Sequence, residues 1–211
     1  GWSVSGGGSD YATIAYSSAG VPLWTNRYRG PGNDSDRAVA VVVDGAGNVF
    51  VTGYSRSASQ YPFNDDYATI KYSNGGVPLW TNRYNGPEDN WDDAFGMAVD
   101  SDGNVFVTGQ SWSGSSFDNV TIGYANDGVP LWTNHYHGPG IFDNGIAVAV
   151  DGSGSVFVTG VSASSDGTYD YATIKYSSEG MPLWTNRYEG PANASDYACG
   201  VAVGSSGNVI V

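Results

Sequence analysis

Short apolar stretches alternate along this chain with clusters of Gly, Pro, Asn, Asp and Ser, and no stretch has the period of an amphipathic helix. The stretches are rich in Val, Ile, Thr, Tyr, Phe and Trp, which favour strands. This pattern predicts antiparallel β-strands in meanders and no helices. The strands predicted in three complete units are Ala38–Asp44, Asn48–Ser55, Asp66–Ser73 and Val77–Asn85; Ala94–Asp100, Asn104–Ser111, Asn119–Ala125 and Val129–Tyr136; and Gly145–Asp151, Ser155–Ser162, Tyr171–Ser177 and Met181–Tyr188.

Two kinds of turn recur between these strands. The first and second strands of a unit are joined by runs such as Asp-Gly-Ala-Gly-Asn at Asp44–Asn48. Such runs predict tight hairpins, because Gly supplies positive φ and Asp or Asn closes the turn onto the backbone. The third and fourth strands are joined by Ser-x-x-Gly-[Val/Met]-Pro. Because Pro has no N–H to donate, the fourth strand is predicted to lie at the edge of its sheet.

A long repeat organises these elements. The line Pro-Leu-Trp-Thr-Asn occurs four times, and its tryptophans, Trp24, Trp80, Trp132 and Trp184, are 56, 52 and 52 residues apart. Four-stranded antiparallel units with this spacing are typical of β-propeller blades. The sequence therefore predicts an all-β fold, a β-propeller of four-stranded antiparallel blades. The four tryptophans are predicted to pack as wedges between neighbouring blades.

The two ends of the chain are in complementary phase. Gly1–Ser3 aligns with Gly53–Ser55, and Asn208–Val211 aligns with Asn48–Val51. We therefore predict a single domain, 1–211, with four blade-equivalents and a split closing blade formed by the N- and C-termini. Its parts are a half-blade at 1–29, blades at 38–85, 94–136 and 145–188, and a half-blade at 196–211. The chain is expected to be a monomeric closed ring, a dimer that shares half-blades, or a segment of a longer array.

The charge of the chain narrows the function classes. With 21 acidic and 8 basic side chains, the net charge is −13. Such a chain repels phosphate backbones and anionic lipid, so neither nucleic-acid binding nor membrane insertion is expected. The single cysteine, Cys199, excludes an intrachain disulfide and is expected to be a buried, inert thiol. Gly1-Trp2 is neither an initiator Met nor a signal peptide, so a processed product or a fragment is expected.

Several long motifs recur in fixed order. They are Asp-Tyr-Ala-Thr-Ile-Lys-Tyr-Ser (Asp66–Ser73, Asp170–Ser177), Pro-Leu-Trp-Thr-Asn-Arg-Tyr-x-Gly-Pro (Pro78–Pro87, Pro182–Pro191) and Ala-Val-Asp-x-x-Gly-x-Val-Phe-Val-Thr-Gly (Ala149–Gly160). With these motifs the chain resembles the bacterial beta-propeller repeat family SBBP, and more weakly the NHL-type propeller repeats. The SBBP resemblance implies an extracellular or cell-surface bacterial protein and no defined catalytic residues.

The loops that differ between repeats are the predicted recognition surface. In a propeller, the loops between second and third strands and the crossings between blades lie on one face, and varied loops on a rigid scaffold commonly carry function. Aromatic side chains beside carboxylates there suit a carbohydrate or protein ligand, although the same aromatics also serve to pack loops onto blades. The predicted ligand-binding residues are Tyr61, Phe63, Trp91, Trp112, Phe117, Phe142, Tyr169 and Tyr197.

One crossing is dense in carboxylates and is a candidate cation site. Its predicted ligands are Glu88, Asp89, Asp92 and Asp93, and calcium is the ion considered; no other cofactor is predicted. The segment Asp100–Asn104 is similar to the start of an Asp-x-Asp-x-Asn calcium-binding loop. A predicted strand follows it directly, where such a loop would need a further Glu ligand, so a hairpin turn is predicted. His135 and His137 occur in one crossing alone and are predicted to be solvated.

These observations together favour a non-enzymatic interaction or structural module with a carbohydrate or protein ligand on the variable loops. No nucleophile elbow, HExxH motif or phosphate loop is present. Two alternatives stay open. One is an enzyme that acts on polysaccharide through acidic loop residues, and the other is a repeat scaffold without a ligand.

Overall fold

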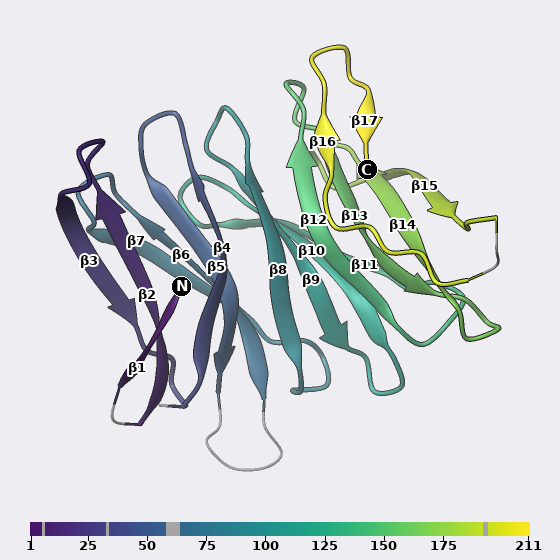
Figure 1. Cartoon of the computed structure of the whole chain (residues 1–211), viewed down its shortest axis with the longest axis horizontal. Coiled ribbons are helices and arrows are strands. Elements are labelled where there is room, and N and C mark those ends of the chain that lie inside the picture. The colour runs from purple at the N-terminus through teal and green to yellow at the C-terminus, as the bar shows by residue number, and fades with distance from the viewer. Residues whose placement is uncertain (6, 33, 58–63, 192–193) are drawn as a thin grey trace. The chain divides into compact units, whose positions relative to one another are not determined.

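The computed structural model of the chain describes residues 1–5, 7–32, 34–57, 64–191 and 194–211. Every regular element in these residues is a β-strand (Figure 1). The strands are β1 (Trp2–Ser5), β2 (Gly8–Tyr16), β3 (Pro22–Tyr28), β4 (Asp36–Val43), β5 (Val49–Arg56), β6 (Asp65–Tyr72), β7 (Pro78–Tyr84), β8 (Asp92–Val99), β9 (Val105–Trp112), β10 (Phe117–Tyr124), β11 (Pro130–Tyr136), β12 (Asp143–Val150), β13 (Val156–Ala163), β14 (Tyr169–Tyr176), β15 (Pro182–Tyr188), β16 (Ala202–Val203) and β17 (Val209–Ile210).

The strands form repeated meander sheets, as in the blades of a β-propeller. Three sheets have four strands in sequence order, β4-β5-β6-β7, β8-β9-β10-β11 and β12-β13-β14-β15 (Figure 1). A three-stranded sheet, β1-β2-β3, and a two-stranded sheet, β16-β17, complete the described strands. The all-β prediction and the three complete blades are confirmed. The single domain and the split closing blade stay predictions.

The chain divides into two compact units, Gly1–Ala94 and Phe95–Val211. The core of the first unit contains Ala38, Val51, Ala68, Ile70 and Tyr72, with Tyr11 fully buried beside them. The core of the second contains Phe106, Val148, Val156, Val158, Ile174 and Tyr176. The residues of each cluster alternate along their strands, but β6 and β10 are buried along almost their whole length, so both faces of these strands are covered.

Repeated tryptophans contact the next blade inside each unit. In the first unit the Trp24 ring lies 5.9 Å from that of Tyr72, and its Nε1 donates a hydrogen bond to the Asn74 carbonyl at 2.9 Å. In the second unit Trp132 lies 5.7 Å from Tyr176 and donates to the Ser178 carbonyl at 3.1 Å. The wedge prediction is confirmed for Trp24 and Trp132.

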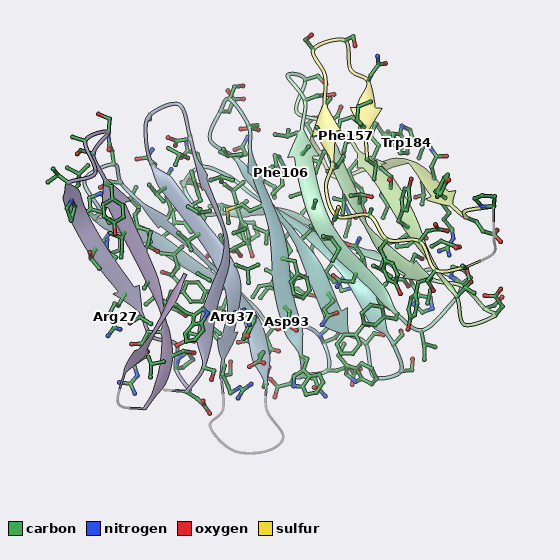
Figure 2. The ribbon with its side chains drawn as sticks, in the orientation of Figure 1. Arg27, Arg37, Asp93, Phe106, Phe157 and Trp184 are labelled. Atoms are coloured by element: carbon green, nitrogen blue, oxygen red, sulfur yellow. The ribbon has the colours of Figure 1, made fainter. Side chains whose placement is uncertain are left out.

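Ring contacts inside a sheet occur at Trp80 and Trp184. Trp80 lies 5.9 Å from Phe50, and Trp184 lies 6.1 Å from Phe157, both centroid to centroid. Figure 2 labels Phe157 and Trp184 in the sheet β12-β13-β14-β15. Trp184 is 36% exposed, so less of its ring is covered than that of a wedge tryptophan.

The turns follow the prediction. In the run Asp100–Asn104, the Asp100 N–H donates to the Asn104 carbonyl at 3.0 Å, and Gly103 has a φ of 81°. The Asp100 Oδ1 also accepts backbone hydrogen bonds from Asp102 and Asn104. This segment is therefore a hairpin turn. The Pro-bearing fourth strands β7, β11 and β15 each lie at an edge of their sheet, as predicted.

The prediction for Cys199 is wrong. Cys199 is exposed and lies outside any strand, because β16 does not begin until Ala202. With only Ala202 and Val203 paired to β17, the segment around Cys199 has no sheet to bury it. Among the described residues there is no helix with the length and apolar character that a membrane crossing needs.

Candidate functional site

An aspartate at the start of the first strand, or ahead of it in the last repeat, receives a hydrogen bond from the preceding crossing. The donor is the N–H of the Gly in the Gly-Pro pair. The distances are 2.7 Å for Gly30 to Asp36, 2.6 Å for Gly86 to Asp92, 2.7 Å for Gly138 to Asp143 and 2.6 Å for Gly190 to Asp196. This hydrogen bond fixes the backbone at the aspartate, which lies two residues ahead of the predicted first strand. The first strands of the complete blades therefore begin two residues earlier than predicted.

A second aspartate, on the third strand, is paired with an arginine from the fourth strand. Arg83 Nη2 lies 2.6 Å from Asp66, and Arg187 Nη2 lies 2.8 Å from Asp170. In the sheet β1-β2-β3, Arg27 is 3.9 Å from Asp10. The three carboxylates are nearly buried, with side chains 6–7% exposed. A buried carboxylate needs a cation or hydrogen-bond donors, and the guanidinium supplies both.

The blade β8–β11 departs from this arrangement. Its third-strand aspartate is Asp118, but the position of the arginine holds His135. Val120 pairs with His135 and Asn119 with Tyr136, so one further step of the ladder brings His137 opposite Asp118. His137 Nδ1 lies 2.8 Å from Asp118 Oδ1. An imidazole from the crossing thus approaches the carboxylate that arginine contacts elsewhere.

Asp118, His137 and Asp143 gather around one point in the second unit. One ligand atom from each lies within 4.8 Å of the others. Asp143 is fully buried and Asp118 is 8% exposed, whereas the His137 side chain is 58% exposed. Burial raises the pKa of the Asp143 carboxyl, although hydrogen bonds from Ser162 and Gly138 offset part of the rise. The hydrogen bond with Asp118 raises the pKa of His137.

Five of the predicted ligand-binding aromatics form a continuous row in this unit. Successive ring centroids are 5.0 Å apart for Trp112 and Phe117, 5.9 Å for Phe117 and Phe142, 6.0 Å for Phe142 and Tyr169, and 6.1 Å for Tyr169 and Tyr197. The first three contacts are edge-to-face and the last is stacked. Four rings are half-buried, and Tyr197 is 62% exposed.

Backbone hydrogen bonds hold the loops that carry this row. The Phe117 N–H donates to the Ile141 carbonyl at 3.1 Å, and the Ala163 N–H donates to the Phe142 carbonyl at 2.8 Å. The crossing between β11 and β12 is therefore fastened to the loops on both sides. A groove of about 430 Å³ opens beside it, lined by Pro139, Gly140, Ile141, Ala163, Ser164, Ser165, Gly167 and Tyr169.

The other three predicted aromatics precede this unit in the chain. Tyr61 and Phe63 lie outside the residues that the structure describes. Trp91 belongs to the first unit and is 46% exposed. Whether any of the eight aromatics binds a ligand stays a prediction.

The predicted cation site at the crossing before β8 is not brought together as one cluster. Asp92 is buried and accepts the Gly86 N–H, as its counterparts do in the other blades. Asp89 accepts hydrogen bonds from Asn85, at 2.6 Å, and from Asn64. Glu88 is exposed, and Asp93 is half-buried in β8 (Figure 2). In the described part of the chain, the group of three cation ligands is Asp118, His137 and Asp143 instead.

Sequence reasoning passed over the pairing of His137 with Asp118. The signal was a break in the repeat, since Asp118 keeps its place while the arginine expected 17 residues later is His135. A carboxylate that loses its usual cation must find another partner if it stays buried. His137 was predicted to be solvated, and its side chain is indeed 58% exposed. The prediction did not include its contact with the carboxylate of Asp118.

The comparisons with known proteins concern the repeat and the fold. Residues 80–118 match the model of the SBBP beta-propeller repeat, which confirms the resemblance over that segment. No curated protein matches the chain. A protein of unknown function from Bacteroides caccae is similar at 12% identity and a TM-score of 0.43, over 88% of this chain and 77% of that one. A gluconolactonase from Xanthomonas campestris is similar at 12% identity and a TM-score of 0.44, over 92% of this chain and 59% of that one. Neither likeness carries an argument about function.

Proposed function

We propose that this chain is a non-enzymatic β-propeller-type module that binds carbohydrate on the loops of its second unit. The observation that carries the proposal is the aromatic row from Trp112 to Tyr197 beside the groove of about 430 Å³. Aromatic faces bury the apolar face of a sugar ring, and nearby polar groups accept or donate hydrogen bonds to its hydroxyls. The exposed Ser165 supplies such a group along the groove.

The exposed parts of the groove favour a ligand over loop packing alone. Ile141 is 74% exposed and lines the groove, and Tyr197 is 62% exposed at the end of the aromatic row. Side chains that served only to pack loops would be covered by them. Another hollow, of about 520 Å³, lies at the opposite end of β12 between two hairpin turns. It is lined by Gly, Ser, Asp and Val and has no aromatic ring.

The acidic residues support binding more than catalysis. Asp92 and Asp143, which begin first strands, accept backbone N–H groups that recur in every repeat. A role that each blade repeats is architectural, whereas hydrolysis of a glycosidic bond needs two carboxyls at one defined separation. This is the support for proposing a module without enzymatic activity.

A glycan array tests the proposal, followed by calorimetry with the glycan that binds best. Tyr197→Ala and Ile141→Ala are expected to weaken binding at least tenfold, because both side chains are exposed at the row and groove. Tyr16→Ala is the matched control, since Tyr16 is 58% exposed but lies in the first unit. Loss of binding in Tyr16→Ala to the same extent, or no bound glycan, would contradict the proposal. Turnover of a polysaccharide that is lost in Asp92→Asn would contradict its non-enzymatic part.

We also propose an extracellular or cell-surface location in a bacterium. The match of residues 80–118 to the SBBP repeat supports it. Fractionation of the native host with an antibody against the chain is the test, and recovery from the cytoplasm alone would argue against it.

A further inference from the structure

We propose that Asp118, His137 and Asp143 form a binding site for a divalent transition-metal ion of the zinc class. The three residues come from β10, from the crossing after β11 and from the start of β12, and their ligand atoms lie within 4.8 Å of one another. The site goes beyond carbohydrate binding, because its residues do not line the proposed groove.

The internal repeat supplies the first support. The carboxylates that correspond to Asp118 are those of Asp10, Asp66 and Asp170, and each faces an arginine, at 3.9, 2.6 and 2.8 Å. In the blade β8–β11 this arginine position holds His135, whose side chain is shorter and carries no fixed charge. In three repeats the guanidinium of an arginine therefore faces the buried carboxylate. In the blade β8–β11 the groups around that carboxylate are an imidazole and a second carboxylate, which are metal ligands.

The chemistry of the three donors points to the class of metal. Imidazole nitrogen and carboxylate oxygen are both ligand types that zinc accepts, whereas calcium prefers six to eight oxygens. Two carboxylates with a neutral imidazole carry a net charge that a divalent ion balances. Arg187 lies nearby through Ser162, but its charge is already paired with Asp170 at 2.8 Å.

The three ligand atoms lie within 4.8 Å of one another, so each separation must change by about 1.5 Å or less to hold such an ion. Tetrahedral zinc with ordinary bond lengths places neighbouring ligand atoms about 3.3 Å apart. His137 Nδ1 and Asp118 Oδ1 are 2.8 Å apart, which is shorter than this separation. The His137 ring is exposed, so it can turn outwards until the two atoms are far enough apart. Asp143 Oδ2 accepts the Gly138 N–H at 2.7 Å and Oδ1 accepts the Ser162 hydroxyl, and an oxygen that accepts one hydrogen bond keeps a second lone pair for a metal.

Water has access to the site from the side of His137, whose side chain is 58% exposed. The two aspartates lie beneath it, fully buried or nearly so. Three protein ligands leave at least one coordination position open. An ion at this place would fasten the crossing to two blades of the second unit.

Zinc binding to the whole chain, prepared without a histidine tag, is the test. Titration against a chromophoric chelator is expected to show one zinc ion per chain, and cobalt in its place is expected to give a tetrahedral ligand-field spectrum. His137→Gln removes an exposed ligand, so folding should survive while affinity falls by more than the roughly 10- to 100-fold loss typical of an outer-shell partner. Asp118→Asn is expected to weaken binding likewise.

Two substitutions at position 135 serve as matched controls. His135→Gln is expected to keep the affinity of the native chain, because His135 is not one of the three ligands. His135→Arg is expected to abolish zinc binding with the fold retained by circular dichroism, because it restores the guanidinium that Arg83 and Arg187 place on Asp66 and Asp170. The proposal is overturned if the native chain binds no zinc, if His137→Gln binds it as tightly, or if His135→Arg leaves the affinity unchanged.

Discussion

The contact between blades in the first unit can be tested by adding a single methyl group to Gly76. Gly76 lies in the turn before β7 with a φ of 82°, and a Cβ built on it would be 2.7 Å from Cγ and Cδ2 of Trp24. The Trp24 ring is held by its hydrogen bond to the Asn74 carbonyl and by its packing on Tyr72. It therefore has little room to give way. Gly76→Ala should destabilise the unit through both backbone strain and overpacking.

Gly20 offers a matched control in the same unit. Its turn has the same Ser-x-x-Gly-Val-Pro pattern, the same hydrogen bond of 2.9 Å from the Gly N–H to the Ser carbonyl, and a φ of 77°. A Cβ on Gly20 would meet nothing within 4 Å. Gly20→Ala should therefore lower the free energy of unfolding by about 1 kcal/mol, the cost of an Ala at positive φ. Gly76→Ala should add about 1–3 kcal/mol for the contact with Trp24.

Urea unfolding followed by far-ultraviolet circular dichroism measures both losses. A double variant, Trp24→Leu with Gly76→Ala, isolates the contact between the added methyl group and the indole. In the Trp24→Leu background, Gly76→Ala should lower the free energy of unfolding by no more than Gly20→Ala does in the native chain. Equal losses in the two Gly→Ala variants, or an extra loss at Gly76 that persists without Trp24, would refute the wedge packing.

Three further predictions concern single residues and the assembly. Burial raises the pKa of Tyr176 to about 12 in the folded chain. The stabilisation by the neutral Tyr176 side chain is therefore complete below pH 10, where the unfolded chain also keeps the proton, and is lost as the pH rises towards 12. Urea unfolding at pH 8 and pH 11 should show that Tyr176→Phe loses about 1 kcal/mol less than the native chain over that interval, and equal losses would contradict the burial. Arg83→Met should lower the free energy of unfolding in urea by about 2 kcal/mol or more, because Asp66 stays buried without its guanidinium partner. Arg27→Met should lower it by less than about 1 kcal/mol, because the Arg27 side chain is 45% exposed and 3.9 Å from Asp10. A larger loss for Arg27→Met than for Arg83→Met would refute this. Analytical ultracentrifugation should give the mass of a monomer if the terminal strands complete one blade, or of a dimer if two chains share them, and a larger open assembly would contradict both.

Much of the fold was predictable because its causes are local. The Gly at positive φ in turns such as Asp100–Asn104 and the Pro that opens each fourth strand are chemical signals read within a few residues. The predicted strands consequently agree with the observed ones to within about two residues. The early start of β12 was not predictable, because it depends on a hydrogen bond between Asp143 and the Gly138 N–H across a crossing.

The candidate sites were predictable only as sets of residues. The eight loop aromatics could be named from the sequence, but nothing in it showed that five of them, from Trp112 to Tyr197, have rings in successive contact. The acidic crossing from Glu88 to Asp93 attracted attention because its carboxylates are adjacent in sequence. Asp92 and Asp93 lie on β8, where adjacent residues point to opposite faces, so their closeness in sequence does not make a cluster in space.

The repeat of Pro-Leu-Trp-Thr-Asn and its turns determined the blades of this protein, because strand formation and hairpin closure depend on neighbours in the sequence. Only the tertiary structure decided which side chains meet at the loops. Asp118, His137 and Asp143 lie up to 25 residues apart, and it is the register of β10 against β11 and the crossing into β12 that bring them together. Register is set by every pair in a ladder at once, so no single segment of the sequence contains it.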